Sequence, residues 1–263
     1  AEARRRPTAD AVLERALGGD ARARVPAISP ERRTVVVLNA KGGCGKTTLA
    51  TNLATFYANA GVATALVDHD PQGSATHWLE ARGTNLPRLA GVAAWRHHGP
   101  VTRTFLMRDA KEARRVVTDT PAALGPAELA RLLPEADRIV VPVLPSSIDI
   151  RAAARFLGAV LLDPSFRRRR PAITVVANRV RQNTLVFKKL ERFLASLEIP
   201  FVATFRDTQL YVHAAEQGEG LFDSRRREGE SRQHQREGLV AGERDVGHLR
   251  GTRGECVGGA DGR

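Results

Sequence analysis

The segment 35–54, VVVLNAKGGCGKTTLATNLA, constrains the fold of this chain more than any other feature. An apolar, β-branched run leads into a glycine-rich turn, and the turn leads directly into a stretch with helical spacing of apolar residues. The glycines at positions 42, 43 and 45 let the backbone curl so that successive N–H groups point inward at a phosphate. A helix that begins near Lys46 adds the partial positive charge of its N-terminus at the same place. The segment therefore predicts a phosphate-binding loop between a buried strand and a helix.

Two side chains of this loop carry the expected chemistry. Lys46 would reach the β- and γ-phosphates of a nucleotide, and the Thr47 hydroxyl would ligate magnesium. A glycine-rich turn with chance lysines is the alternative. It does not account for a strand, a loop, Lys-Thr-Thr and a helix in this order.

Short apolar runs alternate with longer stretches of helical periodicity from Thr34 to about Asp223. Such alternation predicts an α/β, P-loop NTPase-like fold, in which a mostly parallel twisted sheet has helices on both faces. The predicted strands are residues 34–38, 63–67, 115–118, 138–143, 172–177 and 201–205. The apolar residues with helical spacing include Leu49, Leu53, Phe56 and Tyr57, and then Leu185, Leu190, Phe193, Leu194 and Leu197. Residues 83–114 belong to this core, but their pattern predicts no particular element.

Two flanking regions differ in composition from this predicted domain at 34–223. Residues 1–33 hold 8 basic and 5 acidic residues, and we expect an N-terminal arm with one short helix at 9–17, followed by a linker. Residues 224–263 contain 9 glycines and only five large aliphatic residues. This tail buries too little apolar surface to offset the entropy of ordering, so we expect it to be disordered. A second interpretation is that the tail is the product of a shifted reading frame.

Composition excludes several classes of protein. No stretch approaches the ~18–20 apolar residues of a membrane span, and the opening AEARRRPTAD lacks the apolar core of a signal peptide. The two cysteines, Cys44 and Cys256, cannot form a disulfide framework or a four-cysteine metal site. We therefore expect a cytoplasmic protein.

The phosphate loop departs from the usual G-x-x-x-x-G-K-T form, because Ala40 replaces the first glycine and Lys41 adds a second lysine. KGGCGKTT thereby resembles the deviant Walker A loop of the ParA/MinD family of ATPases. In that family the early lysine reaches across a nucleotide-sandwich dimer to the partner's phosphates, and the resemblance gives this role to Lys41. It also implies ATP and Mg²⁺ as cofactors, a homodimer on ATP binding, and Lys41 and Lys46 as catalytic residues. The implied nucleotide contacts of the loop are Lys41, Gly42, Gly43, Cys44, Gly45, Lys46, Thr47 and Thr48.

Two further segments resemble the acidic motifs of the same family. Residues 65–79, ALVDHDPQGSATHWL, are similar to its switch I, and residues 114–125, RRVVTDTPAALG, to its Walker B/switch II. By that match Asp70 orients the attacking water, Asp68 supports the magnesium shell, and Asp119 binds magnesium through its water shell. Independently, a carboxylate at the carboxyl end of a parallel strand faces the ligand crevice. The alternatives are an Asx turn at 68–71 and a common strand-ending aspartate at Asp119.

The resemblance extends over residues 34–220. Residues 138–153, RIVVPVLPSSIDIRAA, are similar to the family's next strand and turn. Residues 172–180, AITVVANRV, resemble the strand whose asparagine contacts adenine, so Asn178 is the implied adenine contact. An asparagine that merely ends a strand as a turn residue is the alternative.

The chain is strongly basic, with a formal net charge of +12. Between Phe166 and Arg206 lie 10 basic residues against 2 acidic ones, and a general preference for arginine codons would not concentrate charge in this way. Lysine and arginine contacts to phosphates give nonspecific, salt-sensitive binding to double-stranded DNA, which ParA-like dimers also show. A solvated helix face and a polar loop are the alternative. The basic residues are Arg167, Arg168, Arg169, Arg170, Arg179, Arg181, Lys188, Lys189, Arg192 and Arg206.

These features together predict a slow, partner-stimulated ParA-like ATPase. It would form an ATP-sandwich dimer, associate with the nucleoid through nonspecific DNA binding, and position an intracellular cargo such as a plasmid, a chromosome or a large protein complex. A cargo-linked, ParB-like protein would activate hydrolysis. The alternative is a MinD-like membrane-cycling regulator of the division site, but the tail offers no amphipathic helix for membrane binding.

Overall fold

The computed structural model describes residues 31–97, 107–122, 124–180, 184–196, 201–206 and 209–223. The predicted helix at 9–17, nearly all of the expected arm and the whole tail at 224–263 lie outside these ranges. Within them, no helix combines the length and apolar character needed to cross a membrane.

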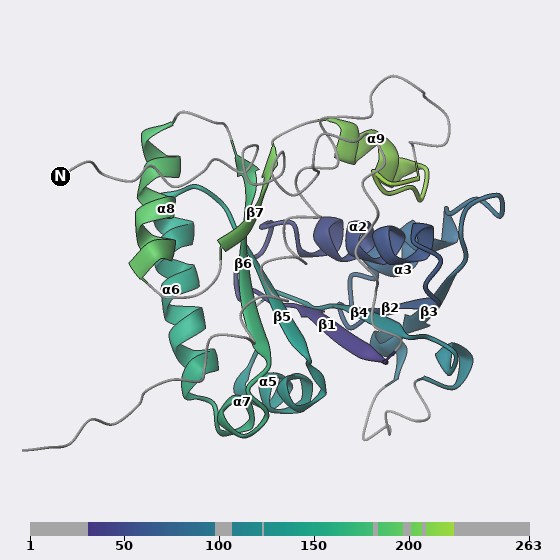
Figure 1. The fold of residues 1–263 in the computed structure, drawn as a ribbon, viewed down its shortest axis with the longest axis horizontal. Helices are drawn as coiled ribbons and strands as arrows, with labels where there is room; N and C mark the ends of the chain where they lie inside the picture. Colours follow the sequence, from purple (N-terminus) through teal and green to yellow (C-terminus); the bar gives the residue numbers. More distant parts are fainter. Residues whose placement is uncertain are drawn as a thin grey trace, which may run out of the picture.

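A parallel sheet with the strand order β3-β2-β4-β1-β5-β6-β7 forms the centre of the described structure (Figure 1). Every neighbouring pair of strands is parallel. The strands are β1 (Arg33–Val37), β2 (Thr64–Asp68), β3 (Leu89–Ala93), β4 (Arg115–Asp119), β5 (Arg138–Val143), β6 (Ala172–Val180) and β7 (Phe201–Arg206). The predicted α/β fold with a parallel sheet is thus confirmed.

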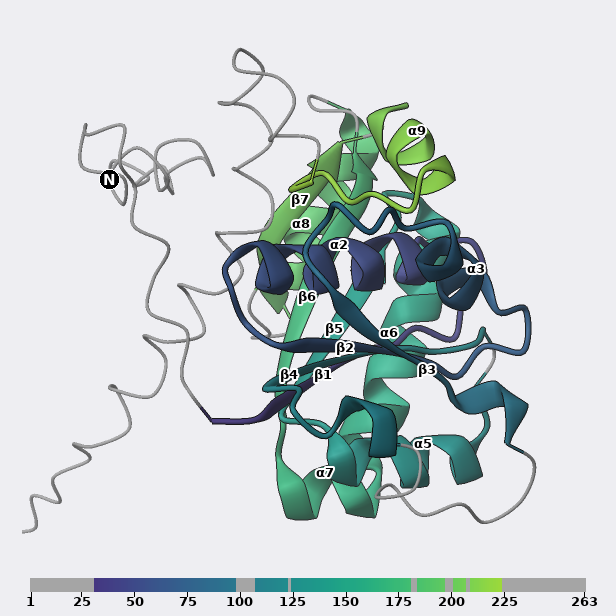
Figure 2. The same ribbon diagram turned by 90° about the vertical axis from the view of Figure 1, so that its right-hand side faces the viewer.

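Helices cover both faces of the sheet. Figure 2 shows α2 and α3 on one face, and α5, α6 and α7 on the other. The α-helices are α2 (Lys46–Asn59), α3 (Ser74–Glu80), α5 (Pro126–Leu132), α6 (Ser147–Leu162), α7 (Pro164–Arg169), α8 (Leu185–Ser196) and α9 (Leu210–Glu216). Three short 3₁₀ helices, η1 (Ala94–Arg96), η2 (Arg108–Ala110) and η3 (Leu133–Glu135), complete the described elements.

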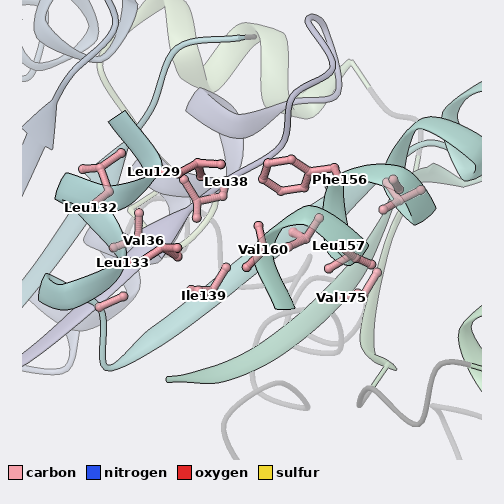
Figure 3. Close-up of a cluster of buried hydrophobic side chains, with 14 of the residues drawn as sticks. Val36, Leu38, Leu129, Leu132, Leu133, Ile139, Phe156, Leu157, Val160 and Val175 are labelled. Carbon is pink, nitrogen blue, oxygen red and sulfur yellow. The ribbon is translucent and has the colours of Figure 1, made fainter. Parts of the chain in front are cut away.

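The β-branched strand residues alternate between two apolar layers, as a sheet with two covered faces requires. On β1, Val36 packs with residues of α5 and α6, whereas Val37 packs with residues of α2. Figure 3 shows the first of these layers, which Phe156, Leu157 and Val160 of α6 contribute to the core. Both layers hold the carboxyl ends of the central strands in fixed positions.

The sequence pattern missed one strand and misplaced one side chain. β3 falls inside the segment 83–114, and it is an edge strand that pairs only with β2. Its sequence LAGVA has a central glycine, because the Cβ of any other residue at position 91 would lie 2.3 Å from Leu79. Leu185, which the helical spacing predicted to be apolar core, begins α8 with 77% of its surface exposed.

The segment 218–223 packs against α2 and α3 rather than trailing away from the domain. Asp223 forms an ion pair with Arg82 over 2.7 Å, and the two side chains are 0% and 5% exposed. Phe222 packs edge-on against Phe56 of α2, and the Leu221 N–H donates to the side chain of Asn52. The folded domain therefore extends to Asp223, in agreement with the predicted boundary.

Candidate functional site

Three neighbouring strand ends meet where the glycine-rich loop begins. β4 lies between β2 and β1, and its last residue, Asp119, is paired with Asp68 on one side and with Val37 on the other. The loop follows directly after β1, so Asp68, Asp119 and the loop share the carboxyl edge of the sheet. This edge is where ligands bind in open parallel sheets. The structure thus brings together the predicted acidic residues and the predicted phosphate loop.

The loop turns back on itself around one carbonyl group. The carbonyl of Lys41 accepts hydrogen bonds from the Lys46 ammonium, at 3.1 Å, and from the Cys44 thiol, at 3.2 Å. Gly43 and Gly45 have φ values of 72° and 89°, in the left-handed region that glycine adopts without strain. Burial raises the pKa of the Cys44 thiol, with a smaller opposing effect of the Lys46 charge, so Cys44 serves as a neutral donor inside the loop.

The two lysines of the loop occupy different environments. Lys46 begins α2, is 7% exposed, and lies folded over the loop backbone. The side chain of Lys41 is 39% exposed at the rim, and its ammonium lies 3.6 Å from Oδ1 of Asp149 at the start of α6. Lys46 thus serves its own loop, whereas Lys41 is available for contacts beyond it.

Asp119 is completely buried, and its Oδ2 has no hydrogen-bond partner among the described residues. Burial raises the pKa of the Asp119 carboxyl to about 7; contact with the Thr47 hydroxyl lowers it, and the charge of Asp68 raises it further. A buried carboxylate oxygen without a partner, next to a hydroxyl, suits a hard divalent cation, which prefers oxygen ligands. The residues present therefore fit a magnesium ion held through Thr47 and Asp119.

Asp68 fixes the turn that follows β2. Its Oδ1 accepts the N–H of Asp70 at 3.0 Å, and its Oδ2 accepts both the N–H and the hydroxyl of Thr76 at 2.8 Å. Asp70 is half-buried in this turn, and its Oδ1 accepts the N–H of Gln72 at 2.9 Å. The Asx turn that we considered as an alternative is therefore present. The roles of Asp68 in a metal shell and of Asp70 toward water stay predictions.

Asn178 lies against the phosphate loop. The side-chain amide donates a hydrogen bond to the Cys44 carbonyl at 2.8 Å, and the residue is buried at the carboxyl end of β6. The site thus includes every residue predicted to bind nucleotide or metal. Of these, Asn178 makes a contact that the resemblance did not imply.

Sequence reasoning missed two polar residues that support the loop. Asp149 holds Lys41, and it also accepts a hydrogen bond from Ser146, the N-cap of α6. The Ser-x-x-Asp spacing of a helix start was a usable signal for this residue. Asn39 donates to the Pro142 carbonyl at 2.7 Å and accepts the Lys41 N–H at 3.0 Å. No local pattern marks Asn39, because its partner strand is distant in sequence.

Comparison with known proteins agrees with this geometry. Residues 35–222 match the family model of the CobQ/CobB/MinD/ParA nucleotide binding domain. The maintenance of carboxysome distribution protein A of Halothiobacillus neapolitanus is 30% identical over 192 residues, which cover 72% of this chain and 86% of that protein. The protein of the same name from Gloeobacter kilaueensis is 36% identical over 194 residues, covering 73% and 85% of the two chains. The chromosome-partitioning ATPase Soj of Thermus thermophilus is 33% identical over 154 residues, or 49% and 61% of the two chains.

Solved structures share the fold. MinD of Pyrococcus horikoshii complexed with Mg-ADP has a TM-score of 0.58 at 18% identity, covering 84% of this chain and 98% of that chain. The ATP complex of a Cyanothece McdA variant has a TM-score of 0.57 at 18% identity, covering 73% and 90%. The fold and the site thus define a P-loop nucleotide-binding protein. Because the family model spans most of the sequence, the chain belongs to the CobQ/CobB/MinD/ParA family, as its motifs indicated.

Proposed function

We propose that this chain is a ParA-type positioning ATPase that pairs with a second copy when it binds ATP. The observation that carries the proposal is the contrast between its two loop lysines. Lys46 is buried over the phosphate loop, whereas Lys41 stands at the rim with an exposed ammonium. A nucleotide in the loop would be neutralised by Lys46 from within, which leaves Lys41 to contact phosphates bound by another subunit.

The site residues divide the work of phosphoryl transfer, which needs positioning and charge stabilisation more than covalent chemistry. The loop N–H groups and Lys46 would hold the β- and γ-phosphates, and Lys41 of the second copy would add positive charge where negative charge develops. Thr47 and Asp119 would hold Mg²⁺, which supplies further positive charge to the phosphates. Asp70 would orient the attacking water from the switch I turn.

The names of the relatives bear on the cargo. Two of them are called maintenance of carboxysome distribution protein A, and another is a chromosome-partitioning ATPase. Because the carboxysome distribution proteins cover more of this chain than the chromosome-partitioning ATPase does, we favour a large protein assembly as cargo. A cargo-linked activator protein would trigger hydrolysis, and nonspecific DNA of the nucleoid would be the surface on which the dimer binds.

The test of the nucleotide site uses one substitution at each loop lysine. Lys46→Ala should abolish ATP binding, because it removes the buried cation of the phosphate loop. Lys41→Ala should leave ATP binding by the monomer nearly intact but prevent ATP-dependent dimerisation. Fluorescent-nucleotide titration and sedimentation velocity measure the two properties. If the Lys41 variant still dimerises with ATP, the sandwich assignment is wrong.

The role of Asp70 is tested in the same assay. Asp70→Ala should permit ATP-dependent dimerisation while stopping hydrolysis, so the dimer should persist when magnesium and ATP are present. Normal turnover by this variant would remove Asp70 from the catalytic step while leaving the nucleotide site itself intact.

A further inference from the structure

Asn178 forms a tie between the phosphate loop and a strand that is not adjacent to it. β6 is separated from β1 by β5 in the sheet, yet the Asn178 amide reaches the Cys44 carbonyl at 2.8 Å. Both residues are buried, at 9% and 1% exposure. Shielding from water makes this hydrogen bond stronger and its loss more costly than at the surface.

The Asn178 side chain can satisfy its surroundings in only one orientation. Its Oδ1 accepts the N–H of Arg179 at 2.9 Å, so its nitrogen must face the Cys44 carbonyl. Arg179 has a φ of 51°, an uncommon left-handed conformation for a residue other than glycine. The end of β6 thus adopts an unfavourable backbone conformation at the residue whose N–H orients the asparagine.

The loop leaves no space for a different arrangement. A Cβ atom at position 45 would lie 2.1 Å from the Asn178 nitrogen, so the asparagine packs directly on the peptide between Cys44 and Gly45. The described chain contains no cis peptide bond, and in a trans peptide the C=O and N–H groups point in opposite directions. Holding the Cys44 carbonyl toward Asn178 therefore turns the Gly45 N–H the other way.

We propose that Asn178 is a positioning residue of the phosphate loop, which orients the Gly45 N–H toward nucleotide phosphates by holding the Cys44 carbonyl. This inference rests on the proposed nucleotide-binding function and deepens it. The amide nitrogen of asparagine has two hydrogens, so one remains for a contact with a base. A base contact and a positioning role nevertheless differ in what they predict for a ligand without a base.

The experiment compares MgATP with inorganic tripolyphosphate, which carries the phosphates but no base. Asn178→Ala should weaken both ligands by a similar factor, about 10-fold for one buried hydrogen bond. Competition against a fluorescent ATP analogue measures both affinities. If the variant binds tripolyphosphate as tightly as the parent chain and only ATP is weakened, Asn178 contacts the base alone and the positioning role is wrong.

Two further variants separate positioning from general loss of stability. Asn178→Leu fills nearly the same volume without a donor, and it should show the same loss of tripolyphosphate affinity even if the alanine variant does not fold. Asn59→Ala is the matched control, because it removes an amide that bonds Thr55 and Asp223 at the far end of α2. This control should lower the melting temperature but keep the parent affinity for tripolyphosphate. An equal loss in the control would overturn the inference.

The design also separates this inference from the proposed function. If the parent chain binds neither MgATP nor tripolyphosphate, the nucleotide site itself is wrong and the role of Asn178 falls with it. If the parent chain binds both, and Asn178→Ala leaves tripolyphosphate binding unchanged, only the positioning role is wrong.

Discussion

The buried carboxyl of Asp119 is suited to a metal at the expense of stability. Its pKa is raised to about 7 by burial, whereas in the unfolded chain it ionises near its ordinary value of 3.8. Between these two values the folded state binds more protons than the unfolded state, so the stability that Asp119 contributes falls as pH rises. Above pH 7 the full cost is present, on the order of 4 kcal/mol.

Asp119→Asn should therefore stabilise the ligand-free protein while removing magnesium-dependent ATP hydrolysis. The gain in free energy of unfolding should be largest near pH 8 and less than half as large at pH 5. His69, whose pKa burial lowers to about 4, loses stability on acidification in both proteins, so its effect cancels in the comparison. Urea titrations at the two pH values measure the gain. An equal gain at both would assign it to packing instead of charge.

The ion pair between Lys41 and Asp149 should compete with pairing of two copies. When Lys41 moves to a partner's phosphates, Asp149 keeps a largely buried carboxylate whose Oδ1 has no hydrogen-bond partner among the described residues. Asp149→Asn removes that cost, so we expect ATP-dependent dimerisation at a several-fold lower protein concentration. Sedimentation equilibrium with ATP would measure the change. A weaker dimer would mean that Asp149 also supports the paired state.

At the scale of elements, the segment 218–223 fastens α2 to α3. Arg82 donates to both oxygens of Asp223 and to the Gly218 carbonyl, and its guanidinium lies 5.6 Å from the centre of the Trp78 ring. Gly218 has a φ of 64°, and a Cβ there would lie 2.4 Å from the Arg82 backbone nitrogen. Each of these features requires the segment to be docked in one position.

Arg82→Ala should consequently lower the free energy of unfolding by about 3–5 kcal/mol, because it leaves Asp223 charged and buried without its partner. Arg96→Ala is the matched control, since its pair with Glu80 spans 3.6 Å between side chains that are 55% and 58% exposed. That control should cost less than about 1 kcal/mol. Denaturant unfolding of both variants decides the point, and equal losses would show that the segment is not clamped in solution.

Periodicity predicted the elements whose residues are strongly apolar, and it failed where tertiary contacts decide. The strand predicted at 34–38 is β1 at Arg33–Val37, and the helix predicted from Lys46 begins there. β3 was missed because it is short, contains Gly91 and is paired on one side only. An edge strand of small residues carries little signal of its own, and its pairing with β2 supplies most of its stability.

The site was predictable for the same reason that parallel sheets place ligands at one edge. Strand-ending Asp68 and Asp119 had to meet the loop once the strands were parallel and adjacent. The bond between Asn178 and Cys44 joins residues 134 apart in sequence, and no local pattern specifies such a distance. The order of strands in the sheet, which local periodicity does not encode, determines that contact.

For the whole molecule, the basic residues that cluster in the sequence divide between two ends of the fold. Arg167, Arg168 and Arg169 lie on α7, which immediately precedes the amino end of β6. Lys188 and Lys189 are exposed on α8, which follows the carboxyl end of β6, near the phosphate loop. Figures 1 and 2 show α7 and α8 at different ends of the molecule. A single continuous basic patch, as the sequence suggested, is therefore not formed by these helices.

This division predicts which end binds DNA in an ATP-dependent way. If ATP brings two copies together through Lys41, the side chains near the phosphate loop are those that pairing gathers onto one surface. Reversing Lys188 and Lys189 to Glu should then lower the slope of log affinity against log salt by about 2, one for each lost phosphate contact per subunit. Reversing Arg167 and Arg168 to Glu changes the net charge equally, so it is the matched control and should leave the slope nearly unchanged.

Filter retention of a random duplex with MgATP, at several salt concentrations from about 50 to about 200 mM, would measure both slopes. Equal losses in the two variants would mean that DNA responds only to the total charge of +12, and a larger loss on α7 would place the DNA at the opposite end of the sheet. In either case the coupling between nucleotide and DNA would have to act over the length of α6, which runs between the two ends, instead of through side chains beside the nucleotide. A selective loss on α8 would instead mean that pairing at the nucleotide edge is itself the event that assembles the DNA-binding surface.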